Sequence, residues 1–156
     1  MKSHEELVGQ AGYMRGAFIN DTIFLERVID EFICRHFCEK EERKIELIES
    51  LMATKRISFD SKMAIARFII DSHYTWFKDK YPSCFKDVTS IIEHRNIFAH
   101  YLLDTSDQGF ENLRSNVIGF IKFDRKTEVI LYTSEQIMEL DKKLRESVDA
   151  FQTLMT

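Results

Sequence analysis

The spacing of apolar residues over the first quarter of the chain is helical. Between about Ser3 and Glu39, apolar side chains recur every three or four residues, which places them on one face of an α-helix. Ile19, Ile23 and Phe24 widen this face beyond a single stripe. A helix that is apolar on more than one side must bury more than one side, so we expect it to pack within its own bundle and against another chain. The stripe itself consists of Phe18, Leu25, Val28, Ile29, Phe32, Ile33 and Phe37.

The same spacing predicts three further helices, over about residues 45–54, 61–78 and 83–103. Ser58 or Asp60 is suited to cap the start of the 61–78 helix, and Pro82 marks the stop and restart that follows it. The charge run 39–44 predicts a solvent-exposed corner. The residues expected to face inward are Ile45, Ile48, Leu51, Met52, Ile65, Phe68, Ile69 and Trp76.

Strict alternation replaces the helical spacing near residue 116. Residues 116–123 (NVIGFIKF) and 128–132 (EVILY) flank a DRKT turn and predict a β-hairpin over about 116–132. Thr133 and Gln136 form a capping-box pattern ahead of a last amphipathic helix, about 134–155. The pattern therefore predicts a mainly all-α fold: an up-and-down bundle of about five helices with a β-hairpin inserted before the last helix.

Composition is consistent with this fold and limits the function. A chain of 156 residues with 44% hydrophobic and 31% charged residues fits one packed domain. One Pro and five Gly favour long helices over a many-stranded sheet. A net charge of −4 argues against broad, sequence-independent nucleic-acid binding but leaves room for a local basic pocket. Lys122, Arg125 and Lys126 at the hairpin tip are the best basic feature for guiding RNA, although a solvated turn is the simpler interpretation.

Cysteine use and the N-terminus point to the cytoplasm. Three cysteines do not form a disulfide framework, the first ten residues lack an apolar signal core, and no run is long enough to cross a membrane. Cys34 and Cys38 lie four residues apart with His36 between them, but a metal site needs further ligands that the sequence does not supply. We therefore expect buried cysteines, no metal site and no cofactor.

The segment 91–103 carries the candidate chemistry. Asn96 and His100 are four residues apart and share a helix face, whereas Arg95 lies about 140° around the helix axis from His100 at 100° per residue. The Arg95 guanidinium and the His100 imidazole can converge only loosely within one chain, and a second copy of the helix would complete a tight site. Glu93 and His94 are interpreted as surface groups.

These residue types suit cleavage of a phosphodiester bond in RNA. A guanidinium can hold phosphate oxygens and stabilise added negative charge, and an imidazole can move the proton of a ribose 2′-hydroxyl. No metal is then required. On spacing alone, a surface Arg95 and a hydrogen-bonded core His100 is the simpler reading, and it stays open. A carboxylate such as Glu26 or Asp30 on the first helix could fix the tautomer of His100, with exposed ion pairs, for example to Arg27, as the alternative.

The stretch RNIFAH (95–100) resembles the Arg-x4-6-His signature of the HEPN superfamily, the helical domains of many prokaryotic toxins and RNA-processing enzymes. FLERVIDEFI, ISFDSKMAIA and EHRNIFAH follow one another in an order similar to that family. The resemblance covers about residues 15–105 of a single domain, 1–156. It leaves the hairpin, about 116–132, and the C-terminal helix, about 134–155, as an elaboration.

The resemblance implies a homodimer through the motif helix and the first helix, with Arg95, Asn96 and His100 of both chains forming a composite site. It implies a metal-independent endoribonuclease of the toxin or defence type, with RNA as substrate and an antitoxin protein as a candidate partner. In one subgroup a Tyr stands two residues after the His, where this chain has Leu102, with Tyr101 adjacent. The family also includes catalytically silent members, so the alternative is a non-catalytic dimeric module that binds a nucleotide or a protein.

Overall fold

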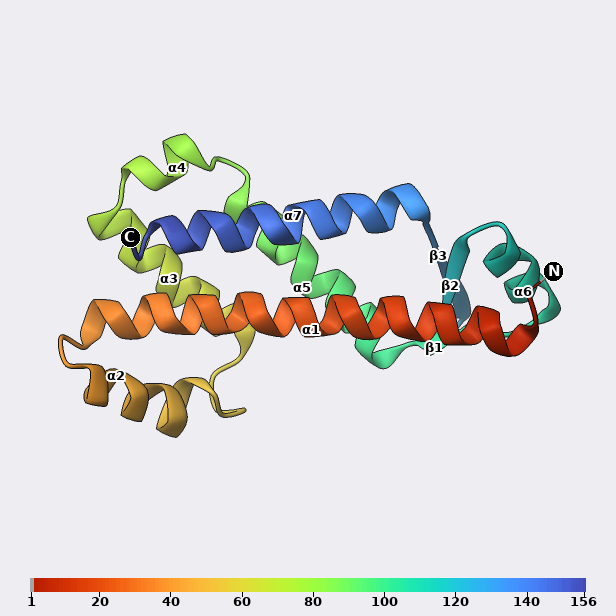
Figure 1. Cartoon of the computed structure of the whole chain (residues 1–156), viewed down its shortest axis with the longest axis horizontal. Helices are drawn as coiled ribbons and strands as arrows, with labels where there is room; N and C mark the ends of the chain where they lie inside the picture. Colours follow the sequence, from red (N-terminus) through yellow and green to blue (C-terminus); the bar gives the residue numbers. More distant parts are fainter. Residues whose placement is uncertain (1) are drawn as a thin grey trace. The chain divides into compact units, whose positions relative to one another are not determined.

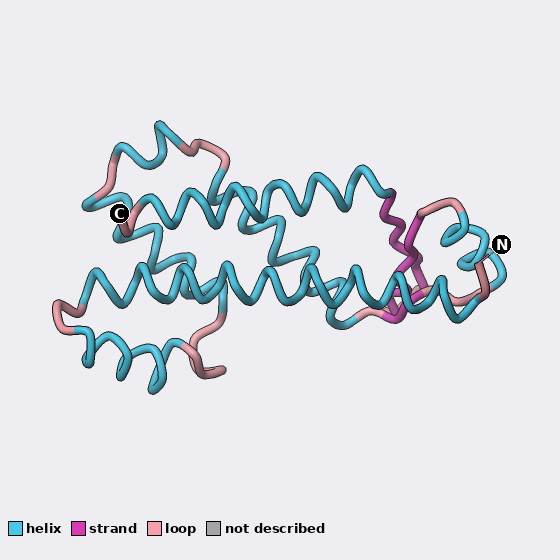
Figure 2. Tube along the Cα trace, in the orientation of Figure 1, coloured by secondary structure: helices cyan, strands magenta, loops and turns pink. Residues whose placement is uncertain are grey.

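The computed structural model describes residues 2–156 and is mainly helical, with a small antiparallel sheet before the last helix (Figure 1). The predicted fold class is confirmed to this extent. Figure 2 shows that most of the chain is helical, that the strands are short, and that a helix follows the last strand. The elements are α1 (His4–Phe37), α2 (Glu41–Leu47), the π-helix η1 (Ile48–Met52), α3 (Phe59–His73), α4 (Trp76–Lys80), α5 (Cys84–His100), β1 (Leu102–Leu103), α6 (Asp107–Arg114), β2 (Val117–Phe123), β3 (Thr127–Thr133) and α7 (Ser134–Thr153).

The chain divides into two compact units. The first, here called the sheet unit, contains the described residues up to Asp21 together with Glu93–Lys142. The second, here called the helical unit, contains Thr22–Ile92 and Lys143–Thr156. Because α1, α5 and α7 each continue from one unit into the other, the chain passes between the units three times within helices. The single-domain organisation stays a prediction.

The sheet has the order β1-β2-β3, with both pairs antiparallel. The β2–β3 hairpin is the predicted one, and it pairs Ile118 with Tyr132 and Phe120 with Ile130. The capping box at its end is confirmed, because the Gln136 amide donates to Thr133 Oγ1 at 3.3 Å and the Thr133 amide to Gln136 Oε1 at 2.8 Å. Strand β1 was not expected, since α5 ends at His100 and the next residues pair with β2 rather than extending the helix to 103.

Four aromatic rings form the core of the sheet unit. The Phe98 ring of α5 lies 4.9 Å from Phe18 of α1, 5.0 Å from Phe120 of β2 and 4.9 Å from Tyr132 of β3, measured between centroids. All four side chains are buried. The inner face of the hairpin is therefore held against α5 at the position of Phe98.

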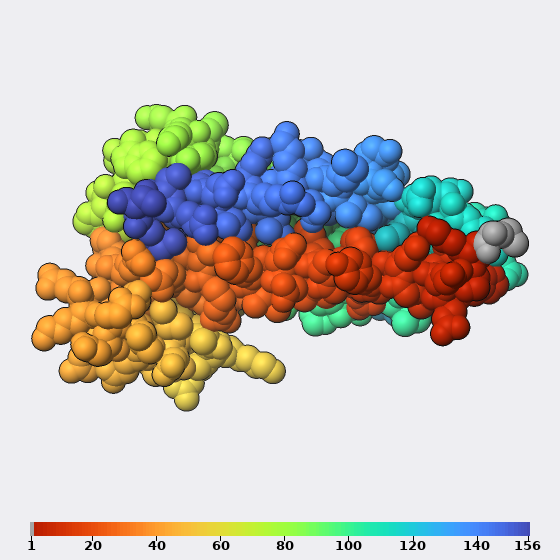
Figure 3. All heavy atoms as spheres, in the orientation of Figure 1, coloured from red at the N-terminus to blue at the C-terminus, as the bar shows by residue number. Residues whose placement is uncertain are grey.

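Helix α6 was not among the helices that the sequence pattern predicted. Ser106 caps it, since the Gly109 amide donates to Ser106 Oγ at 3.1 Å, and the cap shows why a turn-forming residue can begin a helix. Gly109 lies so close to the Asp104 carbonyl that a Cβ would overlap it, so only glycine fits here. The first turns of α1 lie against α6 (Figure 3). There the His4 and Phe110 rings stack with their centroids 3.8 Å apart.

In the helical unit, α3 begins as predicted but has a different buried face. Ser58 is its N-cap and accepts from the Ser61 amide at 3.1 Å. The buried face is Lys62, Ala66, Ile69 and Ile70. Phe68 is two residues from Ala66 and Ile70, about 160° around the axis, which leaves it 71% exposed rather than inward. Trp76 is exposed as well. Because α3 ends at His73 and Trp76 begins the separate helix α4, Trp76 does not continue the buried face of α3.

Two lysines are buried in the helical unit by ion pairing. Lys62 Nζ lies 2.5 Å from Glu26 Oε1 and 3.1 Å from Asp30 Oδ2, and Asp30 also binds Arg27. Burial raises the pKa of the Asp30 carboxyl, against the lowering effect of these cations. A charged residue on the apolar face of α3 is stable here only because carboxylates of α1 meet it.

Lys44 corrects the prediction of a solvated corner at 39–44. Helix α2 begins at Glu41, and Lys44 Nζ lies 2.7 Å from Glu31 Oε1 and 2.7 Å from Glu41 Oε1. Partial burial acts to raise the pKa of the Glu31 carboxyl, but hydrogen bonds from Lys44 and Arg35 act in the opposite direction and outweigh it. The net effect is a lowered pKa. The charge run is thus partly a structural ion-pair cluster.

Candidate functional site on helix α5

Burial of Phe98 sets the orientation of the residues around it on α5. At 100° per residue, Asn96 and His100 each lie about 160° from Phe98, and Arg95 lies about 60° from it. The exposures follow this order, with Phe98 buried, Arg95 half-buried, and Asn96 and His100 exposed. The sheet unit therefore presents Asn96 and His100 to solvent on the side of α5 opposite its core.

The predicted site residues are only partly brought together within one chain. Arg95 Nη1 donates to Asn96 Oδ1 at 3.2 Å, and Asn96 and His100 share a face as expected. Across the described residues, there is no hydrogen bond between Arg95 and His100 and no ion pair to Arg95. Arg95 and His100 thus start from different sides of α5, as the spacing predicted, and His100 is not a hydrogen-bonded core histidine.

Arg15 adds a second guanidinium that the sequence analysis did not single out. Its Nη2 donates to the Ala99 carbonyl at 3.2 Å, and its Cζ lies 5.7 Å from the centre of the Phe120 ring. This places a fixed positive charge at the last turn of α5, one residue from His100, where the helix dipole is negative. The sequence contained one indication of this position. Arg15 is three residues before the core residue Phe18, so both side chains lie on one side of α1.

His94 is not the surface group that was expected. It is half-buried, and its Nδ1 lies 2.7 Å from Tyr132 Oη. Burial raises the pKa of the Tyr132 phenol to about 12, and the nearby Tyr101 contributes in the same direction. A phenol that stays protonated can donate to Nδ1, which would leave the proton of a neutral His94 on Nε2. The pair ties α5 to β3 and holds the motif helix in place.

The carboxylates considered as partners for His100 bind other groups. Glu26 and Asp30 pair with the buried Lys62 in the helical unit. Over residues 2–156, the His100 ring has no hydrogen-bond partner. Its tautomer is consequently not fixed by a hydrogen bond within this chain, and both ring nitrogens are available to a ligand.

The hairpin tip is basic but partly neutralised. Lys122 Nζ lies 3.8 Å from Asp124 Oδ2, whereas Arg125 and Lys126 are exposed. A phosphate backbone could therefore meet two cations at this turn, with one carboxylate beside them.

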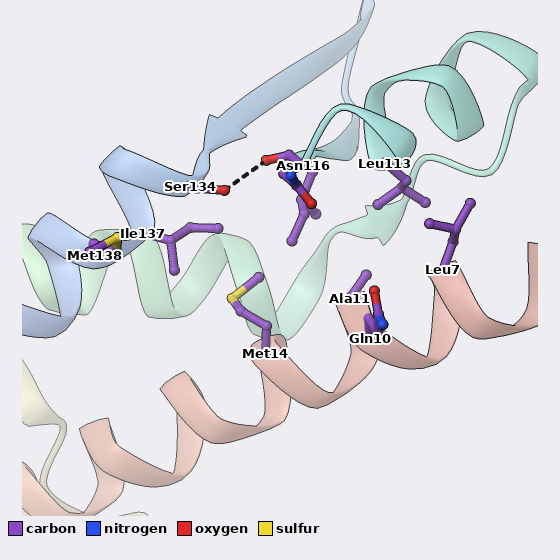
Figure 4. Close-up of a pocket in the computed structure, with 10 residues that line it drawn as sticks. Leu7, Gln10, Ala11, Met14, Leu113, Asn116, Ser134, Ile137 and Met138 are labelled. Carbon is purple, nitrogen blue, oxygen red and sulfur yellow. Dashed lines mark hydrogen bonds between the residues drawn. The ribbon is translucent and has the colours of Figure 1, made fainter. Parts of the chain in front are cut away.

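A separate cavity in the sheet unit is apolar. It has a volume of about 250 Å³ and lies between α1, the α6–β2 connection and α7 (Figure 4). Ser134 Oγ, on its rim, donates to the Asn116 carbonyl at 3.2 Å. None of the lining residues is charged, so the cavity is not where the chemistry of α5 would take place. The lining consists of Leu7, Gln10, Ala11, Met14, Leu113, Asn116, Ile118, Ser134, Ile137 and Met138.

Among the described residues, the cysteines and the other potential metal ligands do not form a second candidate site. Cys34 and Cys84 are buried and Cys38 is half-buried, all as free thiols. Burial raises the pKa of Cys34 and of Cys84 to about 12. Within the described part of the chain there is no group of three His, Cys, Asp or Glu placed to hold a metal ion. Along residues 2–156, none of the helices combines the length and apolar character that a membrane crossing requires.

Comparison with models of known protein families, with curated proteins and with solved structures finds no match to this chain.

Proposed function

We propose that the chain is a metal-independent endoribonuclease of the HEPN toxin or defence type, cleaving RNA at a composite site on a homodimer. The observation that carries the proposal is the presentation of α5. Burial of Phe98 turns Asn96 and His100 to solvent, with Arg95 on the adjoining flank. The proposal includes the up-and-down arrangement of about five helices and the single domain expected from the resemblance.

Each of the three residues has a chemical role in this proposal. The His100 imidazole takes the proton of a ribose 2′-hydroxyl, whose oxygen attacks the adjacent phosphorus. The Arg95 guanidinium binds two phosphate oxygens and stabilises the added negative charge of the transition state. Asn96 accepts a hydrogen bond from Arg95 at 3.2 Å and so orients the guanidinium before substrate binds.

A second copy completes the site, because Arg95 and His100 of one chain point to different sides of α5. With two motif helices facing each other, the His100 of the second copy protonates the departing 5′-oxygen. The products are a 2′,3′-cyclic phosphate and a 5′-hydroxyl. Arg15, fixed at the Ala99 carbonyl, adds positive charge near the same turn.

The alternative is a non-catalytic dimeric module that binds a nucleotide or a protein. One observation favours it: the His100 ring has no hydrogen-bond partner among residues 2–156, whereas catalytic imidazoles are held in one tautomer by a neighbour. In this alternative, Arg95 and Arg15 bind an anionic group and no bond is cleaved.

Incubation of the purified protein with bulk RNA and excess chelator tests the proposal. We expect cleavage that survives the chelator, yields 2′,3′-cyclic phosphate ends, and falls by about 10²-fold or more in His100→Ala. Arg95→Lys should also lose activity, because a lysine keeps the charge but not the fork. His73→Ala is the matched control, since His73 is an exposed histidine of the helical unit.

The same variants separate the two functions. Intact RNA that is nevertheless bound, with binding lost in Arg95→Ala, would support the module and contradict the nuclease. Expression in a bacterial host offers a second readout, since a toxin should arrest growth and His100→Ala should relieve the arrest. Unchanged cleavage in His100→Ala would remove the basis of the catalytic proposal.

A further inference from the structure

Strand β3 forms an open edge of the sheet. The sheet order is β1-β2-β3, so β3 pairs on one side only. Thr127–Thr133 is a seven-residue strand without proline, and it carries one charged side chain, Glu128. An edge of this length and composition is a template for pairing with another strand, since natural edges are usually shortened, charged or covered.

The ladder shows which main-chain groups of β3 face the open side. The Asp104 amide donates to the Gly119 carbonyl at 2.8 Å, so Gly119 directs its main-chain groups toward β1. By the alternation of an antiparallel ladder, Ile118 and Phe120 then face β3 and bond to Tyr132 and Ile130. The N–H and C=O of Val129 and Leu131 consequently point away from β2, to the open edge.

An independent bond supports this assignment. Thr133 belongs to the same set as Val129 and Leu131, and its amide donates to Gln136 Oε1 rather than to β2. For Val129 and Leu131, the described residues record no such bond to a side chain or a loop. Four main-chain groups therefore stand at the open edge without a partner.

The side chains of the same two residues form an apolar outer face. Val129 is 44% and Leu131 48% exposed. The side chains of Val129 and Leu131 partly cover Gly119 of β2, which has no side chain of its own on this face. A Cβ on Gly119 would lie 3.1 Å from Val129 Cγ1 and 3.3 Å from Leu131 Cδ2. Leu102 of β1, 58% exposed, is paired with Ile121 and extends this face. Backbone donors and apolar side chains thus coincide at one edge.

We propose that the β3 edge binds the β3 edge of a second copy, antiparallel and about a two-fold axis at Ile130. In this register, Val129 of one chain is opposite Leu131 of the other, and each such pair exchanges both main-chain hydrogen bonds. The two Ile130 residues face each other, and Glu128 is opposite Tyr132, so no like charges meet. The arrangement is isologous, with every contact made twice.

Charge at the ends of the strand favours this partner. In the same register, the exposed Arg125 and Lys126 at one hairpin tip lie beside the N-terminus of the other copy's α7. That first turn carries Glu135. Each cationic tip therefore meets a carboxylate of the other copy at both ends of the paired strands, which an unrelated peptide would not provide.

The inference does not rest on the ribonuclease proposal. Pairing at β3 leaves His100 unaltered and would persist in a catalytically inactive chain. If motif helices also pair, one chain uses two different surfaces, and the assembly is larger than a dimer. The test therefore follows the mass of the assembly and not activity.

Sedimentation of the full chain tests the register through charge complementation. Val129→Glu and Leu131→Lys should each halve the mass of the assembly, because each places an unpaired charge on the apolar contact. The double variant Val129→Glu/Leu131→Lys should restore it, since Glu and Lys then face each other twice. Met138→Lys is the matched control, being a large exposed apolar residue of the same unit outside the strand. Circular dichroism verifies that every variant is folded.

A cysteine variant tests the two-fold axis directly. Facing Ile130 residues form a non-hydrogen-bonded pair with Cα atoms about 4.5 Å apart, which suits a disulfide. In a Cys38→Ser background, Ile130→Cys should cross-link into covalent dimers under mild oxidation, whereas Thr127→Cys, opposite Thr133, should not. A wild-type monomer at about 100 µM, far above a micromolar Kd, would overturn the proposal. So would single variants that keep the wild-type mass, or a double variant that fails to recover it.

Discussion

Replacing Phe98 with Ala tests how the sheet supports the motif helix. Phe98 is fully buried between Phe18, Phe120 and Tyr132, at 4.9–5.0 Å between ring centroids. Truncating a buried Phe typically costs about 3–5 kcal/mol, from lost transfer free energy and the cavity left behind. Each of the three ring pairs adds about 0.5–1.5 kcal/mol, which favours the upper part of this range.

Urea unfolding followed by circular dichroism measures the effect. We expect the midpoint to fall sharply with little change in the slope, because the denatured chain is nearly the same. Phe68→Ala is the matched control: Phe68 is 71% exposed on α3, so its loss should change the free energy of unfolding by less than about 0.5 kcal/mol.

A loss of less than about 1 kcal/mol for Phe98→Ala would refute the reasoning. It would mean that Phe98 does not anchor α5 in the core of the sheet unit. The exposure of Asn96 and His100 could then not be derived from its burial.

Three further outcomes follow from the buried charges and thiols. Lys62→Met should destabilise the chain by about 3 kcal/mol in urea unfolding, because it leaves two carboxylates without their buried cation. Glu31 has a lowered pKa in the folded state, so it contributes stability above its unfolded pKa that is lost as the pH falls through its folded pKa. The difference in unfolding free energy between wild type and Glu31→Gln should therefore be present at pH 7 and shrink steadily as the pH is lowered into the acidic range. Iodoacetamide should label Cys38 in the native protein, with Cys34 and Cys84 labelled only in denaturant, as counted by mass spectrometry.

Regular periodicity in the sequence predicted the long elements well. The first helix, the hairpin and the last helix lie close to their expected bounds, because each has an unbroken apolar pattern and a clear start or stop. The caps at Ser58 and Thr133 were also predicted, since a hydroxyl three residues before a free amide is a local signal.

The elements that were missed depend on contacts distant in sequence. Strand β1 contains only Leu102 and Leu103 and exists because β2 offers partners about twenty residues later. Lys44 and Lys62 were not predicted to be buried, since an apolar pattern cannot show that Glu31 or Asp30 will meet a lysine across the fold. Phe68 was assigned inward for the same reason, because hydrophobicity does not identify which side of a mixed helix a neighbour covers.

The candidate site combines both kinds of information. Sequence spacing alone placed Asn96 and His100 on one face and Arg95 on another, and α5 has that geometry. Arg15 could not be found in the same way, because its bond to the Ala99 carbonyl joins residues 84 positions apart.

The hairpin has a structural role that the resemblance does not explain. Two of the three rings around Phe98 come from β2 and β3, and Tyr132 Oη also lies 2.7 Å from His94 Nδ1, one residue before Arg95. A chain ending near residue 105 would therefore keep the motif but lose most of the surface that buries Phe98. Without that surface, Phe18 would be the only one of the three rings left against Phe98. The segment after residue 105 is thus part of the structure that presents Asn96 and His100, and the same hairpin offers its free edge to a second copy.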